Sequence, residues 1–212
     1  MVRRRRGQSE GAGSGRSRRP AKSPVGLRVI GGTFRGRRLL YSGDPDVRPM
    51  KDRVREAVFN ILATAVRGKH AIDLFAGTGA LGLEALSRGA SHATFLEQHF
   101  PTAEVLRRNV ATLGVERQVD VFAGDVFLRA RWQHLLGTVP WLVFCSPPYA
   151  FYLDRNEEML DLLDALMQAA PPGSIFVVES DQRFNHGQLR QADHWDVRCY
   201  PPAVIATCVK SS

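Results

Sequence analysis

Four consecutive residues, Ser146-Pro147-Pro148-Tyr149, have the types and order that could act on an amino group. They follow the apolar run Trp141–Cys145, and two prolines in a row make the turn stiff and give its carbonyl groups set directions. The Ser146 side chain and the Pro147 carbonyl could accept hydrogen bonds from the two N–H groups of an exocyclic base amine. Its lone pair would then be free to attack an activated methyl group, while Tyr149 stacks on the base. We therefore predict that these four residues are catalytic, although a proline-rich turn can also be a plain loop.

A glycine-bearing turn lies upstream, where an apolar run ends at Asp73 and is followed by Ala76-Gly77-Thr78-Gly79. Glycines allow a ligand to approach the backbone where a Cβ would collide. Only one residue separates the two glycines, and both the rest of the dinucleotide fingerprint and the lysine of a P-loop are missing. The turn therefore suits a ligand with an adenosine and no phosphate, such as S-adenosylmethionine, or else it is a simple strand-to-helix connection.

Three acids could complete this cofactor site. Glu97 lies 18 residues beyond Gly79 at the end of the next apolar run, where a carboxylate can accept hydrogen bonds from both ribose hydroxyls. Asp125 follows the third run and suits either the adenine amino group or an N-cap, and Asp73 could anchor the loop or meet the cofactor ammonium group. The predicted cofactor-binding residues are Asp73, Phe75, Ala76, Gly77, Thr78, Gly79, Glu97, Gln98, Asp125 and Val126.

An alternation of strands and helices is predicted to position these groups. The strands are expected at His70–Phe75, Ala93–Glu97, Val119–Phe122, Trp141–Cys145, Ser174–Glu179, Asp196–Tyr200 and Ala203–Val209, and the helices at Ala80–Arg88, Pro101–Leu113, Val126–Leu136 and Arg155–Ala169. Strands joined by helices of this length form βαβ units and a mainly parallel sheet. Only two prolines separate the last two strands, which predicts an antiparallel hairpin at that end. The fold class is therefore α/β and Rossmann-like.

The N-terminal quarter has a different composition from the rest of the chain. Residues 1–25 are rich in Arg, Gly and Ser, and we expect a disordered basic tail there. Residues 26–68 form a predicted extension, with two short strands over 27–41 and a helix from Lys51 to Val66. The third predicted unit is a methyltransferase domain over residues 69–212.

Positive charge is concentrated in the same quarter. Residues 1–26 hold eight Lys/Arg and one acid, residues 27–55 hold eight Lys/Arg and three acids, and the remainder holds thirteen Lys/Arg and seventeen acids. This asymmetry indicates a polyanionic partner, RNA or DNA. The candidate phosphate contacts are Arg35, Arg37, Arg38, Arg48, Lys51 and Arg53. Some of these arginines could instead form structural ion pairs, as Arg53 or Arg55 could with Glu56.

Composition also limits cofactors and location. Cys145, Cys199 and Cys208 have no metal-ligand spacing and are odd in number, which favours a reducing compartment and no metal. No run of about 18 apolar residues is present, so we expect no membrane span. The Arg-rich start is not followed by the apolar stretch of a secretory signal, and a cytoplasmic protein is predicted.

The stretch Leu27–Tyr149 resembles the bacterial RsmD-like family, which methylates guanine N2 in small-subunit ribosomal RNA. The matching segments are RVIGGTFRGRRL, VRPMKDRVREAVFNIL, DLFAGTGALGLEALSRGA, FLEQ and the SPPY turn. The resemblance implies a seven-stranded Rossmann-like methyltransferase fold with an N-terminal extension that helps to seat RNA. It also implies S-adenosylmethionine as cofactor and, as partner of a monomeric enzyme, ribosomal RNA or an assembling small subunit.

Two positions depart from the family pattern, because Ser146 stands where Asp is usual and Met50 where Thr is common. A serine hydroxyl carries no charge, and charge-assisted hydrogen bonds are about twice as strong as neutral ones. Two alternatives therefore stay open: a DNA amino-methyltransferase of the cytosine-N4 or adenine-N6 type, and an rRNA-binding assembly protein with weakened catalysis. A protein-glutamine methyltransferase is less favoured, since its turn normally begins with Asn.

Overall fold

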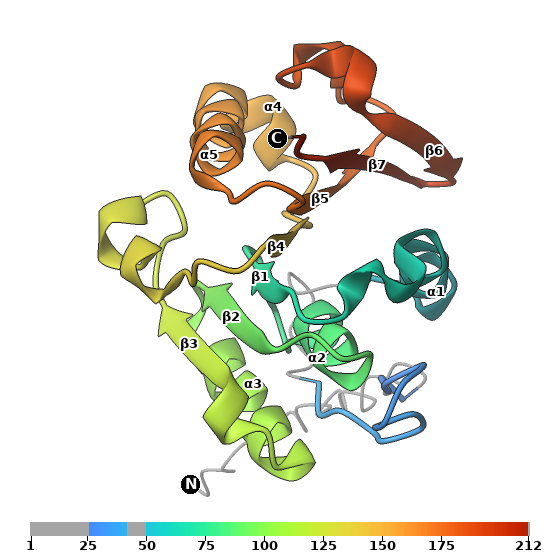
Figure 1. Cartoon of the computed structure of the whole chain (residues 1–212), viewed down its shortest axis with the longest axis vertical. Helices are drawn as coiled ribbons and strands as arrows, with labels where there is room; N and C mark the ends of the chain where they lie inside the picture. The colour runs from blue at the N-terminus through green and yellow to red at the C-terminus, as the bar shows by residue number, and fades with distance from the viewer. Residues whose placement is uncertain (1–25, 42–49, 212) are drawn as a thin grey trace, which may run out of the picture.

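A twisted sheet of seven strands, in the order β3-β2-β1-β4-β5-β7-β6, forms the centre of the molecule (Figure 1). The structure is a computed structural model that describes residues 26–41 and 50–211. Its strands are β1 His70–Asp73, β2 His92–Glu97, β3 Val119–Ala123, β4 Trp141–Cys145, β5 Ile175–Asp181, β6 Asp196–Tyr200 and β7 Ala203–Val209. Strands β1 to β5 are parallel, whereas β7 is antiparallel to both β5 and β6. The predicted fold class and its C-terminal hairpin are confirmed.

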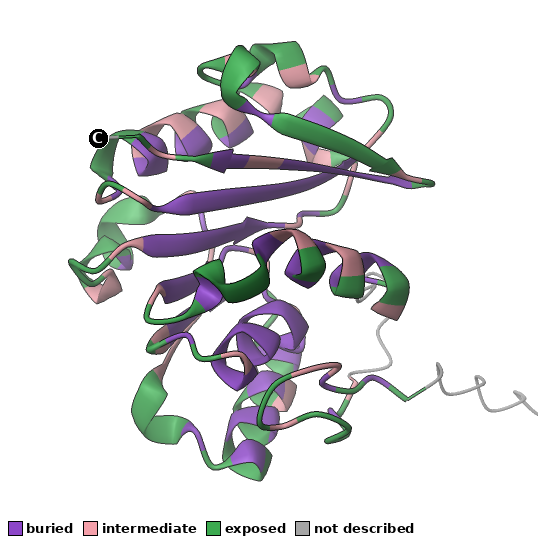
Figure 2. Ribbon diagram, turned by 45° about the vertical axis from the view of Figure 1, so that its right-hand side comes forward, coloured by how far each residue is buried: buried purple, intermediate pink, exposed green. Residues whose placement is uncertain are grey.

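Helices cover both faces of the sheet. Helices α1 (Asp52–Leu62), α2 (Ala80–Ser87) and α3 (Phe100–Leu113) pack on one face, and α4 (Phe151–Asp154) and α5 (Asn156–Ala169) pack on the other. Neighbouring strand residues point to opposite faces, so Phe144 belongs to the first core and Cys145 to the second. The central strands are consequently buried along their length (Figure 2), as expected for a parallel sheet covered on both sides.

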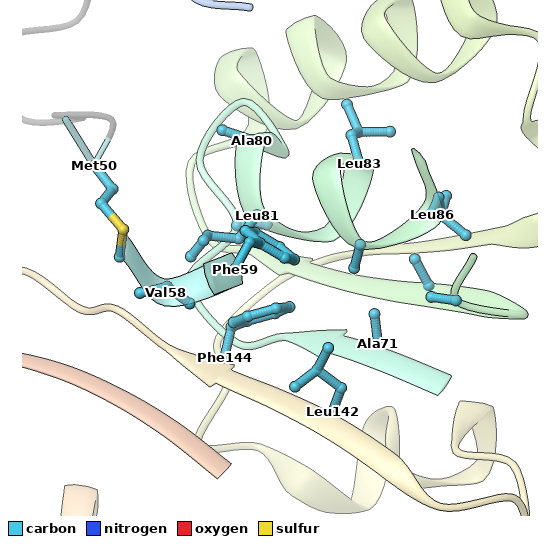
Figure 3. Packing of buried hydrophobic residues seen from close by; sticks show 14 of the residues in the cluster. Met50, Val58, Phe59, Ala71, Ala80, Leu81, Leu83, Leu86, Leu142 and Phe144 are labelled. Atoms are coloured by element: carbon cyan, nitrogen blue, oxygen red, sulfur yellow. The ribbon is translucent and has the colours of Figure 1, made fainter. Parts of the chain in front are cut away.

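The N-terminal extension shares the core of the first face. Phe59 of α1 lies between α2 and β4, and its ring centroid is 5.7 Å from that of Phe144 (Figure 3). Leu81 of α2 lies beside Phe59, while Val58 and Met50 continue the cluster toward the start of α1. Because these side chains are buried together with the sheet, the position of α1 relative to the strands is determined by packing.

A buried carboxylate fastens the first part of the extension to α2. Glu84, which is fully buried, accepts hydrogen bonds from the backbone N–H groups of Ile30 (2.6 Å) and Gly31 (2.8 Å) and from Arg88 Nε (2.7 Å). Gly32 has φ +73°, and a Cβ there would lie 1.8 Å from the backbone oxygen of Ser87. The Ile-Gly-Gly motif therefore matches a close contact with α2 that a larger residue would prevent.

Three predicted elements are shorter than expected or absent. The ribbon over residues 27–41 is reduced to one antiparallel bridge, between Arg28 and Arg38, and the helix predicted from Lys51 to Val66 ends at Leu62 with a 3-10 turn after it. The helix predicted over Val126–Leu136 is wrong, because two 3-10 turns, Arg129–Arg131 and Gln133–Leu135, occupy that segment. Trp132 is fully buried there and donates its indole N–H to the Val126 carbonyl, so burial of one large side chain overrides the helical spacing.

Candidate active site

The predicted site residues come together at the carboxyl ends of the parallel strands. Asp73 ends β1, Glu97 ends β2, and Ser146 follows β4. In an open α/β sheet these strand ends form the crevice where ligands bind. Here they border a cavity of about 890 Å³, which is large enough for a nucleoside-sized ligand with room beside it.

The cavity is lined by the loop after β1, the strand ends, the proline turn and the start of α1. Its walls include Met50, Lys51, Val54, Asp73, Phe75, Ala76, Gly77, Thr78, Glu97, Gln98, Gly124, Val126, Ser146, Pro147, Pro148, Tyr149, Phe151, Glu179, Pro202 and Ala203. All four predicted catalytic residues and eight of the ten predicted cofactor residues are among them. The two that are not are Gly79 and Asp125.

Asp73 is the most strongly perturbed carboxyl in the cavity. Its Oδ2 accepts a hydrogen bond from the Gly82 backbone N–H (3.1 Å), whereas its buried Oδ1 has no hydrogen-bond partner. Burial, with a smaller contribution from the negative charge of Glu97, raises the pKa of Asp73 to about 7. A buried acceptor without a partner is costly, and a ligand ammonium group at Oδ1 would remove that cost.

Glu97 holds the glycine loop in place. Its Oε2 accepts the Gly77 backbone N–H (2.7 Å) and its Oε1 accepts the His99 backbone N–H (2.7 Å). Gly77 has φ +53°, a left-handed conformation that favours glycine. Glu97 therefore holds the loop from the end of β2 and also lines the cavity.

Gly79 and Asp125 make contacts with neighbouring elements. Gly79 has φ +87°, and a Cβ there would lie 2.2 Å from Leu106 of α3, so this glycine permits close helix packing. Asp125 Oδ1 accepts the Phe127 backbone N–H (2.9 Å), and its Oδ2 lies 4.0 Å from Arg155. Asp125 thus makes the capping type of contact that its sequence position also suggested, without the helix predicted to follow it.

The proline turn is held by a residue that sequence reasoning missed. Ser146 Oγ donates a hydrogen bond to Glu179 Oε2, and the Tyr149 hydroxyl donates to Glu179 Oε1 (2.9 Å). Glu179 lies on β5 beside β4 and is only 7% exposed. The available signal was the one that identified Glu97, an acid near the carboxyl end of a predicted strand.

The described basic candidates lie on the surface of the extension. The side chains of Arg35, Arg37, Arg38, Lys51 and Arg53 are all exposed. Arg37 also donates to the Thr112 carbonyl (2.9 Å), and Lys51 is part of the cavity wall.

Arg55 is fully buried and donates to the Arg28 carbonyl (2.7 Å) and to Asp52, so its role is structural, with Asp52 as its ion-pair partner. The predicted tail and Arg48 lie outside the described residues.

Metal and membrane sites are not found in residues 26–41 and 50–211. No cluster of His, Cys, Asp or Glu there has a geometry that could hold a metal ion. In the same ranges no helix is long and apolar enough to cross a membrane.

The donors and acceptors present in the cavity fit S-adenosylmethionine. The unpartnered Asp73 Oδ1 suits its ammonium group, the Glu97 carboxylate suits its ribose, and Gly77 lines the cavity in a left-handed conformation without a Cβ. A sheet of order 3-2-1-4-5-7-6 with these residues at the carboxyl ends of its parallel strands defines the class of S-adenosylmethionine-dependent methyltransferases with a Rossmann-like fold.

Comparison with known proteins specifies the family. The profile of the family described as Conserved hypothetical protein 95 matches residues 27–200, and the chain belongs to this family. It is 42% identical over 153 residues to ribosomal RNA small subunit methyltransferase D of Escherichia coli K12, covering 71% of this chain and 73% of that protein. The Haemophilus influenzae protein of the same name is 44% identical, covering 71% and 77%. The RsmD-like resemblance of the motifs is thereby confirmed.

Solved structures agree with this assignment. The structure of Escherichia coli yhhF has a TM-score of 0.69 and 29% identity, covering 88% of this chain and 98% of that chain. A hypothetical protein from Thermus thermophilus also has a TM-score of 0.69, with 26% identity and coverage of 86% and 99%. Both matches include more of the chain than the sequence matches do, so the similarity in fold extends into the C-terminal part.

Proposed function

We propose that this protein methylates the exocyclic N2 of a guanine in small-subunit (16S) ribosomal RNA. One observation carries the proposal: the glycine loop after β1 and the proline turn after β4 line the same cavity, and Lys51 of the basic extension lies on its wall. A methyl donor held by the loop and a base held by the turn would therefore meet. The names of the relatives in Escherichia coli and Haemophilus influenzae support ribosomal RNA as the substrate.

On this proposal the residues of the loop hold the cofactor. Asp73 would receive its ammonium group, and Glu97 would accept its ribose hydroxyls. When bound, S-adenosylmethionine supplies a methyl group that its positive sulfur makes electrophilic. The protein therefore needs no strong base to activate the methyl donor, and its main contribution is placement and electrostatics.

The proline turn would prepare the amine. Ser146 Oγ and the Pro147 carbonyl are two acceptors on a stiff turn, and hydrogen bonds from both amine N–H groups would leave the nitrogen lone pair pointing away from them. Tyr149 would hold the base by stacking, with its hydroxyl fixed on Glu179 (2.9 Å). A guanine N2 amine offers both N–H groups when the base is turned out of any pairing.

The basic extension would hold the RNA phosphates. Arg35, Arg38 and Lys51 are exposed, and they lie on a segment in which Lys and Arg exceed acids by five. Such contacts position a nucleic acid without reading its sequence. The proposal includes ribosomal RNA or an assembling small subunit as the partner, a monomeric enzyme, and a cytoplasmic location.

The reaction is tested with purified protein and S-adenosylmethionine carrying a labelled methyl group. The substrates are 16S rRNA and small subunits from a strain that lacks the enzyme, and genomic DNA from the same strain. Nucleoside mass spectrometry should find one labelled N2-methylguanosine in the RNA. Labelled N4-methylcytosine or N6-methyladenine in DNA would replace this proposal by the DNA alternative. Binding of cofactor and RNA without any methylated product would favour an assembly protein.

RNA seating is tested separately by salt dependence. A double variant, Arg35→Ala/Arg38→Ala, should bind RNA more weakly. Its slope of log K against log salt should be smaller in magnitude by about 0.7–0.9 for each phosphate that is no longer neutralised. Arg117→Ala is the matched control, because Arg117 is also exposed but lies outside the basic extension, in the turn before β3. Deletion of residues 1–25 should also flatten the slope, with cofactor affinity unchanged. Equal slopes for all proteins would remove these residues from the RNA interface.

A further inference from the structure

Glu179 has an unusual position for a carboxylate. It is 7% exposed, it lines the cavity, and two hydroxyl groups of the proline turn, those of Ser146 and Tyr149, donate to its two oxygens. The backbone carbonyl of Glu179 is held as well, by the Tyr152 hydroxyl (3.0 Å). Its side chain is therefore held, and its hydrogen bond with Ser146 Oγ links it to the proline turn on the wall of the cavity.

No cation is paired with this carboxylate among the residues that the structure describes. The titratable groups around it are Tyr149, Tyr152 and Cys145, whose pKa values are all raised, so that they are neutral near pH 7. On its own strand the next acid is Asp181, which pairs with Arg183. The facing strand β7 contributes an apolar neighbour, Ile205.

We propose that Glu179 is a positioning residue that acts through Ser146: it strengthens Ser146 Oγ as an acceptor and takes up the proton that the amine must lose. This inference rests on the proposed transfer of a methyl group to an amine. Because the hydroxyl proton of Ser146 points to the carboxylate, the lone pairs of Oγ are left for the substrate N–H. A hydroxyl that donates to a carboxylate is also polarised and accepts more strongly. Glu179 thus supplies, one hydrogen bond further away, the negative charge that an aspartate at position 146 would carry.

Transfer of a methyl group to the amine requires a group that accepts a proton. When the amine nitrogen forms its bond to the methyl carbon, it uses its lone pair and becomes positively charged, and one N–H proton must then leave. That proton passes to Ser146 Oγ while the hydroxyl proton of Ser146 passes to Glu179 Oε2. The N–H electron pair returns to nitrogen, Ser146 regains its neutral form, and Glu179 becomes a carboxylic acid that later releases the proton to water.

The acidity of Glu179 suits this role. Burial raises its pKa above the ordinary value, and the hydrogen bonds from Ser146 and Tyr149 partly oppose that change. A carboxylate with a raised pKa takes up a proton more readily than a solvated one. The rate should therefore fall on the acidic side as Glu179 becomes protonated before reaction.

The test compares E179Q, S146A and the double variant S146A/E179Q with the wild type, and D181N is the control that removes a carboxylate from the same strand. We expect E179Q to lower kcat about 100-fold, with KM for RNA changed less than about threefold, and to abolish the acidic limb of the pH–rate profile. S146A should have a similar loss, and the double variant should be no slower than either single variant, because both residues act in one path. D181N should keep the wild-type rate and profile.

Two further measurements separate this path from a structural role. Tyr149→Phe keeps the ring but removes a hydrogen bond that lowers the Glu179 pKa, so the acidic limb should move to higher pH. In protein labelled with ¹³C at glutamate carboxyl groups, the resonance that E179Q removes should titrate above the ordinary glutamate range. Binding of S-adenosylhomocysteine, measured by calorimetry, should be unchanged in E179Q.

The outcomes are distinct. If the wild type methylates no base, the proposed function fails, whatever Glu179 does. If the wild type is active and E179Q keeps its rate and its acidic limb, the role of Glu179 is wrong. Additive losses in S146A and E179Q would also overturn the shared path, as would an acidic limb that does not move in Tyr149→Phe.

Discussion

Replacing Asp73 by Asn would separate two effects of the buried carboxylate. One is the stability that its charge removes from the ligand-free protein, and the other is the affinity that it adds for the cofactor. Asn has nearly the same shape, and its side-chain oxygen can still accept the Gly82 N–H that Asp73 Oδ2 accepts at 3.1 Å. The substitution removes the charge on Oδ1, which is buried and has no hydrogen-bond partner. We therefore expect the variant to gain stability relative to the wild type as the pH rises, and to bind the cofactor less well.

The magnitude follows from the pKa of Asp73, which burial raises from 3.8 to about 7. For a group with a raised pKa, the stabilising contribution of its neutral form is complete below the unfolded-state pKa and is lost as the pH rises through the folded-state pKa. Between about pH 5 and about pH 8, this linkage lowers the free energy of unfolding of the ligand-free wild type by about 2.5 kcal/mol. D73N lacks this dependence. Its unpartnered amide costs about 1–3 kcal/mol, but that cost is independent of pH and cancels between the two conditions.

The assay is urea unfolding of ligand-free wild type and D73N at the two pH values, together with calorimetric titration of S-adenosylhomocysteine. The stability difference, D73N minus wild type, should become more positive by about 2.5 kcal/mol from the lower to the higher pH. Cofactor affinity should fall about ten- to hundredfold in D73N, as expected for loss of a charged hydrogen-bond partner. A stability difference that is constant with pH would refute the raised pKa, and unchanged affinity would refute the ammonium contact.

Two other predictions concern the attachment of the N-terminal extension. Gly32→Ala should lower the free energy of unfolding by about 2–4 kcal/mol, since its Cβ would meet the Ser87 backbone oxygen at 1.8 Å; Gly36→Ala, at φ +83° with open space around it, should lose only about 1 kcal/mol. Equal losses in urea unfolding would show that conformational strain alone matters. Glu84→Gln should cost about 2–4 kcal/mol by weakening charged hydrogen bonds, including that from Arg88 (2.7 Å), and limited proteolysis should then cut within residues 26–41. Unchanged protection there would argue against this anchor.

Much of the fold and part of the site could be predicted from local sequence patterns. Apolar runs of strand length, separated by helical spacing, predicted all seven strands and the mainly parallel sheet. The glycine loop and Glu97 were recognisable because the carboxyl ends of parallel strands always meet at one edge. Each of these features depends on residues close together in the chain, and hydrophobic periodicity records them directly.

The wrong helix prediction and the contacts that the sequence did not reveal have the same physical origin. Residues 126–136 have apolar residues at helical spacing, yet Trp132 is buried in the second core and the segment folds as 3-10 turns around it. Whether a large side chain finds a pocket depends on elements far away in the chain. The arginines show the same limit, since Arg55 is fully buried and holds the Arg28 carbonyl, whereas Arg35 is exposed.

By itself, then, the sequence determined the kind of sheet, the glycine loop and the stiff proline turn, since short segments determine these features. Only the tertiary structure placed Glu179 behind Ser146, left Asp73 Oδ1 buried without a partner, and made Lys51 part of the cavity wall. These contacts join β4 to β5 and α1 to the sheet. Ser146 and Glu179, for example, are 33 residues apart in the chain. The pKa of an ionisable group and the strength of its hydrogen bonds depend on its burial and its neighbours in space. Neither follows from spacing along the chain.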